Sequence, residues 1–171
     1  MKILILSIFI YSCAISAEIP SGQATAEGVA CDMAKAFINA DKELWETIVM
    51  KDDNGDYSEF LKNMSTEMDK QKILDPDKRS GPKKIQICYK MGKLSKNGPN
   101  SYAFAVFNYD EIGFVDVGVL GTNDKQIMNR TFVYRSKDKW FALPRPDLFP
   151  LLTMGLNDEQ RPAEVVYRDK P

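Results

Sequence analysis

Hydrophobic residues recur at helical spacing through the first part of the chain. From Ala26 to Ile38, apolar side chains lie three or four residues apart, which is typical of one buried face of a helix. Thr25 is suited to cap this helix, and Asp41 is suited to cap a shorter one that ends near Val49. A similar spacing continues from Tyr57 to about Lys72. The pattern therefore predicts three helices, over residues 26–38, 41–49 and 57–72.

After Pro82 the pattern changes to alternation of apolar and polar residues, which indicates strands. Strands are predicted over residues 85–91, 114–120 and 128–134, and residues 102–109 are apolar on both faces, as in a central strand. A polar turn at 136–139 then joins the third of these strands to residues 140–143. Helices followed by about five antiparallel strands indicate an α+β fold, with the helices packed on one face of a sheet.

The length and the turn residues set the expected domain organisation. With 171 residues the chain fits one domain, which we place at residues 26–145 after a polar tail at 18–25. Prolines stop the strand pattern after residue 143, and a short helix near 147–156 followed by a loose charged tail is expected within 146–171. Trp45 and Trp140 sit among apolar neighbours and are both predicted to belong to the core.

The first 17 residues have the layout of a secretory signal peptide. Lys2 precedes an apolar run at residues 3–11, and small residues follow it; the run is too short for a permanent membrane span. Cleavage after Ser16 or Ala17 is one expected route. The other is lipidation of Cys13, because residues 10–13 resemble a bacterial lipobox, from which Tyr11 departs. The protein is expected to be secreted or periplasmic, and membrane-tethered only if Cys13 carries lipid.

Two further cysteines, Cys31 and Cys88, would remain in the folded domain. An even number in an oxidising compartment is compatible with a disulfide. However, strict alternation places Cys88 on the same strand face as Gln86 and Lys90, pointing away from the core. Two unpaired small residues are therefore the favoured interpretation, and the disulfide is the alternative.

The composition removes several classes of function. The chain has no histidine, which excludes Ser-His-Asp and Cys-His catalysis and histidine-ligated zinc. A net charge of −1 and a pI near 5.6 argue against nucleic-acid binding. We find no glycine-rich phosphate loop and predict no cofactor and no metal. Any acid–base pair would need Asp, Glu or Tyr, yet Asp41 is expected to cap a helix and Asp116 to face solvent.

The order of elements resembles the nuclear transport factor 2-like superfamily. The resemblance rests on the helix, the Asp-capped helix at 40–45, the third helix and the closing hairpin at 131–144 with its Trp-bearing strand, and it covers residues 26–145. It implies a conical fold with helices on a curved sheet, a mouth that can hold a small ligand, and dimerisation through the sheet. Because the superfamily includes enzymes and binding modules alike, it does not decide function.

The candidate ligand-binding residues are Tyr89, Arg130, Phe132 and Tyr134, which share strand faces with apolar residues. Inside the cone, the Arg130 guanidinium would favour an acidic group on a small apolar ligand. The alternative is that these aromatics are ordinary packing and that Arg130 is exposed. The predicted function is an exported, non-catalytic binding or interaction domain. A His-free isomerase- or dehydratase-like enzyme using Asp and Tyr is the second hypothesis.

Overall fold

The N-terminal part of the chain forms α1 (Ala26–Asn39), α2 (Lys42–Ile48) and α3 (Asp56–Lys72), followed by a short 3₁₀ turn at Pro76–Lys78. The structure is a computed structural model and describes residues 18–49, 56–95, 111–143, 152 and 164–169, with the backbone alone at 56–58. The two predicted caps are confirmed. The Thr25 hydroxyl accepts from the Gly28 N–H at 3.0 Å, and the Asp41 carboxylate accepts from the Leu44 N–H at 3.0 Å.

Replacing Asp41 by alanine should lower the free energy of unfolding by roughly 0.5–2 kcal/mol, because the first turn of α2 loses its side-chain acceptor. The measurement is urea denaturation followed by circular dichroism. Glu43→Ala in the same exposed turn is the matched control, since the structure gives Glu43 no capping role. Equal losses of unfolding free energy in the two variants would contradict a specific capping role of Asp41.

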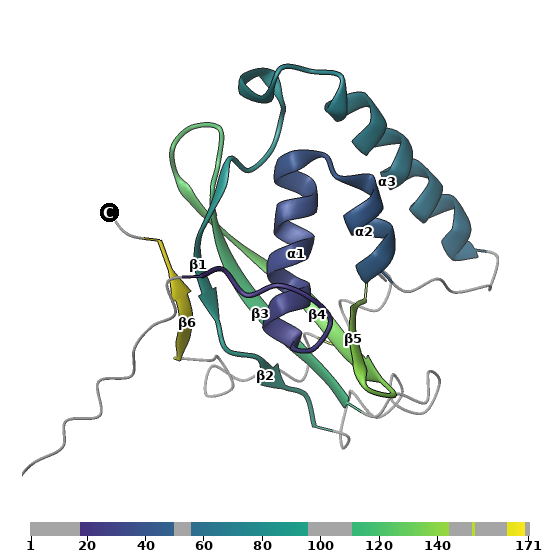
Figure 1. Cartoon of the computed structure of the whole chain (residues 1–171), viewed down its shortest axis with the longest axis vertical. Coiled ribbons are helices and arrows are strands. Elements are labelled where there is room, and N and C mark those ends of the chain that lie inside the picture. The colour runs from purple at the N-terminus through teal and green to yellow at the C-terminus, as the bar shows by residue number, and fades with distance from the viewer. Residues whose placement is uncertain (1–17, 50–55, 96–110, 144–151, 153–163, 170–171) are drawn as a thin grey trace, which may run out of the picture.

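In the part of the chain that the structure describes, six strands form one antiparallel sheet (Figure 1). They are β1 (Lys84–Tyr89), β2 (Gly92–Lys93), β3 (Glu111–Leu120), β4 (Gln126–Ser136), β5 (Lys139–Ala142) and β6 (Val165–Arg168). The order is β5-β4-β3-β1-β6, and β2 also pairs with β3. The expected α+β architecture, with helices on one side of a curved sheet, is confirmed.

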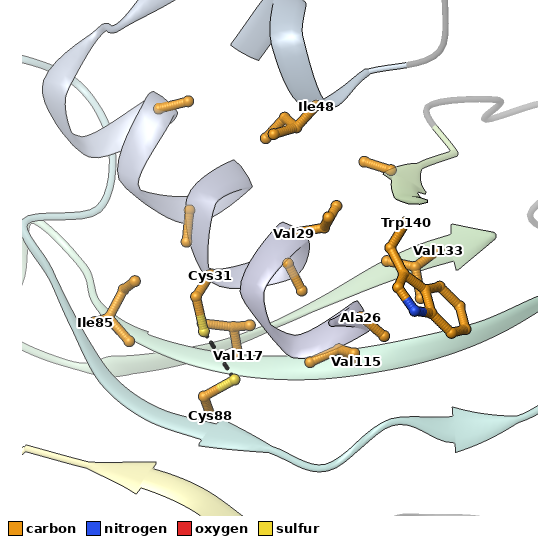
Figure 2. Close-up of a cluster of buried hydrophobic side chains, with 14 of the residues drawn as sticks. Ala26, Val29, Cys31, Ile48, Ile85, Cys88, Val115, Val117, Val133 and Trp140 are labelled. Atoms are coloured by element: carbon orange, nitrogen blue, oxygen red, sulfur yellow. Dashed lines mark hydrogen bonds between the residues drawn. The ribbon is translucent and has the colours of Figure 1, made fainter. Parts of the chain in front are cut away.

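The helices cover one face of the sheet and bury the main core there. Val115, Val117 and Val119 of β3 face α1, as their alternation predicts, and each is at most 1% exposed. Trp45 and Trp140 join the same cluster at 3% and 8% exposure. Figure 2 shows Trp140 beside Val133, next to the first turn of α1. The prediction that both tryptophans belong to the core is confirmed.

A second apolar cluster lies on the opposite face of the sheet. Ile112, Phe114, Phe132 and Tyr134 of this cluster alternate with the first set along β3 and β4. Three leucines from outside the strands join them: Leu94, Leu143 and Leu152. The central strands are therefore buried on both faces, which accounts for their nearly continuous apolar sequence.

The prediction of a loose C-terminal tail is wrong for residues 165–168. These residues form β6, which pairs with β1, and Tyr167 is 6% exposed in the main core. Its neighbours are charged or half-buried, so this short edge strand has a weak sequence signal. The signal segment with Cys13, the strand expected at 102–109 and most of the helix expected at 147–156 lie outside the described residues. None of the described helices has the length and apolar character needed to cross a bilayer.

Candidate functional site

Three of the four residues predicted to line the cone lie on the sheet face that points away from the helices. Thr131 and Val133 of β4 face α1, so Arg130, Phe132 and Tyr134 face the other way. Tyr89 is the half-buried last residue of β1, where the pairing with β6 shifts register between Cys88 and Tyr89. Arg130, Phe132 and Tyr134 thus share one face of β4, as expected, and the assignment of these three residues and Tyr89 to a ligand site stays a prediction.

Arg130 is occupied by a carboxylate on the neighbouring strand. Asp116 lies directly across from it in the β3–β4 register, and Arg130 Nε and Nη2 donate to the two Asp116 oxygens at 2.7 Å each. These hydrogen bonds raise the pKa of Arg130 above its usual value, and the guanidinium lies 4.2 Å from the centroid of the Phe114 ring. Asp116 is consequently half-buried in an ion pair, rather than solvent-facing as expected.

The aromatic residues of this face pack on one another. Phe132 meets Phe114 edge to face with ring centroids 6.5 Å apart, and Tyr134 stacks on Phe141 at 5.5 Å. Phe132 and Tyr134 are each 2% exposed. Their geometry agrees with the packing alternative, because paired aromatic side chains on a sheet stabilise it without any ligand.

A cavity of about 430 Å³ lies on the helix side, against the edge of β4. It is bounded by α1 at Met33, Ala34 and Phe37, by Phe60 of α3, by Val117 and Leu143, and by residues 128–132 of β4. β5 pairs with β4 only from Val133 onward, so this stretch of β4 borders the cavity along its edge. Arg130 and Phe132 therefore border the space even though their side chains belong to the outer face.

A smaller hollow of about 240 Å³ adjoins the first and shares Ala34, Phe37 and Asn129 with it. Its other walls come from α3 and from the loop at residues 80–82. Phe37 borders both spaces and is 39% exposed, although it belongs to the apolar stripe of α1. A large aromatic side chain left partly uncovered at the junction of two hollows suits contact with an apolar ligand.

Sequence reasoning missed Asn129 and Thr131, and a weak signal for them existed. Both stand at helix-facing positions of β4, in a series that otherwise carries Ile127 and Val133. Asn129 is exposed and Thr131 is half-buried, so these polar residues mark the part of β4 that lies outside the packed core. The structure places both beside the cavity.

Among the described residues that bound the larger cavity, Asn129 and Thr131 are neutral and polar, Arg130 is cationic, and none carries a carboxylate. Glu67 borders the smaller hollow, and a hydrogen bond donated by Gln71 lowers its pKa. The buried carboxylate of Asp32 lies on α1 outside both spaces and has Lys35 at 3.1 Å. Among the described residues, no group of three or more His, Cys, Asp or Glu side chains could hold a metal ion.

Cys31 and Cys88 face each other in the main core, with their sulfur atoms 2.8 Å apart (Figure 2). The prediction that Cys88 points away from the core is wrong. The register between β1 and β3 shifts between Ile85 and Ile87, so a bulge interrupts the alternation. Ile85 and Cys88, three residues apart, consequently both face α1.

The comparisons with known proteins add little to this geometry. No family model matches the chain, and no curated protein matches it either. A solved structure from Campylobacter jejuni, assigned provisionally as an NTF2-like transpeptidase, is similar to 70% of this chain over 97% of its own length, with 18% identity and a TM-score of 0.44. The described residues themselves show an α+β fold, in which helices cover one face of an antiparallel sheet.

Proposed function

We propose that this protein is an exported, non-catalytic binding domain that holds a small, largely apolar and uncharged molecule in the cavity beside β4. The cavity of about 430 Å³ carries the proposal, since it falls within the range of roughly 300–1,000 Å³ typical of ligand sites. Met33, Phe37 and Phe60 supply apolar walls, and Asn129 and Thr131 supply a few neutral polar contacts. Such a combination orients a ligand without requiring charge.

The charges of the site argue against an acidic ligand. Arg130 is the cation among the described residues that bound this cavity, and its Nε and Nη2 already donate to Asp116. A ligand carboxylate would have to compete with a bidentate ion pair that is already in place. The outward direction of the Arg130 side chain lowers its access to the cavity further.

The ionisable groups near the cavity also favour binding over acid–base chemistry. An enzyme of this fold without histidine would need an Asp, Glu or Tyr at the reacting atoms. In the part of the chain that the structure describes, no Asp, Glu or Tyr bounds the larger cavity. The buried carboxylate on α1, Asp32, is neutralised by Lys35 and accepts two further hydrogen bonds.

The test uses N-phenyl-1-naphthylamine, a neutral dye whose fluorescence rises in apolar sites. We expect one saturable site in the protein. Met33→Trp should fill part of the cavity and weaken dye binding by roughly ten-fold or more, which corresponds to 1.4 kcal/mol. Ile73→Trp is the matched control, because Ile73 is 85% exposed and borders neither hollow; its affinity should equal that of the unmodified protein.

Competition by two molecules of equal chain length tests the ligand class. Decanol should displace the dye at least as well as decanoic acid at pH 7 if the site is neutral. A marked preference for the acid would contradict the uncharged ligand. Absence of saturable dye binding, or equal affinity in Met33→Trp and Ile73→Trp, would overturn the proposed site.

A further inference from the structure

The side chains of Cys31 and Cys88 are aimed at each other from two different elements. Cys31 projects from the middle of α1 and Cys88 from β1, and both are completely buried. Their sulfurs are 2.8 Å apart, so a shift of roughly 0.8 Å would bring them to the disulfide bond length of about 2.05 Å. The two thiols already face each other, so α1 and β1 do not have to be reoriented for the bond to form.

We propose that Cys31 and Cys88 form an intramolecular disulfide bond that joins α1 to β1 when the chain folds in an oxidising compartment. The two thiols lose two protons and two electrons, and an Sγ–Sγ bond forms. The electrons pass by thiol–disulfide exchange to an external disulfide, either of an oxidoreductase or of oxidised glutathione, which is reduced to two thiols. This bond goes beyond the proposed binding function and does not depend on it.

Burial determines when the bond can form. The thiolate is the attacking species in disulfide exchange, but hydrogen bonding with Cys88 and burial raise the pKa of the Cys31 thiol far above its usual value. Neither sulfur is accessible to an external disulfide once α1 has packed on the sheet. The oxidation therefore belongs to the folding reaction, and the finished bond is shielded from reductants. The bond is therefore a structural disulfide and not a reversible redox switch.

The bond would also brace the candidate binding site. α1 supplies Met33, Ala34 and Phe37 to the cavity walls, within two turns of Cys31. The bridge closes a loop between residues 57 positions apart in sequence, and closing a long loop removes conformational freedom from the unfolded chain. A covalent link between α1 and β1 fixes the position of the helical cavity wall relative to the sheet.

The experiment uses the full chain with Cys13→Ser, so that no third thiol can exchange. The protein is refolded from denaturant either with a mixture of reduced and oxidised glutathione or with excess dithiothreitol. After the oxidising refold, alkylation of the denatured protein should find no free thiol, and peptide mapping should recover Cys31 linked to Cys88. The oxidised monomer should melt roughly 5–15 °C higher than the reduced monomer.

The variant with Cys31→Ala and Cys88→Ala in the same background is the control and should melt at one temperature in both buffers. The oxidised and reduced forms of the Cys13→Ser protein have the same sequence, so comparing them tests the proposal even if the double-alanine control folds poorly. The native oxidised protein should also resist dithiothreitol until denaturant is added. Two alkylatable thiols after the oxidising refold, disulfide-linked dimers, reduction of the native bond without denaturant, or equal melting temperatures would overturn the proposal.

Discussion

Replacing Trp140 by alanine should lower the free energy of unfolding by roughly 3–5 kcal/mol. The indole is 8% exposed and belongs to the cluster between α1 and the sheet. Its removal leaves a large void where the short strand β5 meets the core, and close-packed surroundings collapse only partly into such a space. The backbone N–H of Trp140 also donates to the Gln23 carbonyl at 2.9 Å, so loosening β5 affects the N-terminal segment as well.

The measurement is urea denaturation followed by far-ultraviolet circular dichroism, because the substitution removes one of the two tryptophans and would distort a fluorescence signal. Lys139→Ala is the control, since Lys139 is the exposed neighbour on the same strand. Trp140→Phe keeps much of the volume and should lose less than the alanine variant. An unchanged midpoint in Trp140→Ala would show that the indole contributes no packing energy.

The helices and the closing hairpin were predictable because their signals are local. Apolar spacing identifies the face of each helix, and a side-chain oxygen marks the start of α1 at Thr25 and of α2 at Asp41. The hairpin from β4 into β5 needs only a polar turn between two apolar runs. These features depend on residues within a few positions of one another, so a single sequence contains the information.

Properties that depend on strand register were not predictable in this way. The bulge in β1 reverses the face of Cys88, and nothing in the alternation of Ile85, Ile87 and Tyr89 reveals it. The ion pair between Asp116 and Arg130 exists because the β3–β4 register sets the two residues opposite each other. The pairing of β6 with β1 likewise joins residues that are 76 to 81 positions apart in the sequence.

The cavity depends on where one strand ends relative to its neighbour. β5 has 4 residues and β4 has 11, so part of β4 extends past its partner and borders the space under α1 and α3. Its walls come from four elements and include Met33 and Phe37, which the helical spacing assigns to an ordinary core stripe. The sequence marks such residues as apolar, and only their arrangement in space distinguishes a wall from a packed interior.

The structural role of Asp32 was not predicted from the sequence. A charged residue in a helix is normally expected on the exposed face, but Asp32 is buried. It is 3% exposed. One carboxylate oxygen accepts from the Ser21 hydroxyl and the other from the Gly22 N–H, each at 2.7 Å, and Lys35 lies 3.1 Å away. Through these hydrogen bonds the carboxylate holds the segment before α1 against the side of that helix.

Asp32→Ala should therefore lower the free energy of unfolding by roughly 2–4 kcal/mol, because it leaves the Ser21 and Gly22 donors without their charged acceptor. Asp69→Ala provides a matched comparison: that carboxylate pairs with Lys42 at 3.0 Å but is 57% exposed, and losing it should cost less than about 1 kcal/mol. Both values come from urea denaturation at pH 7. Equal losses in the two variants would mean that the burial of Asp32 contributes nothing, and that the segment before α1 is held by packing alone.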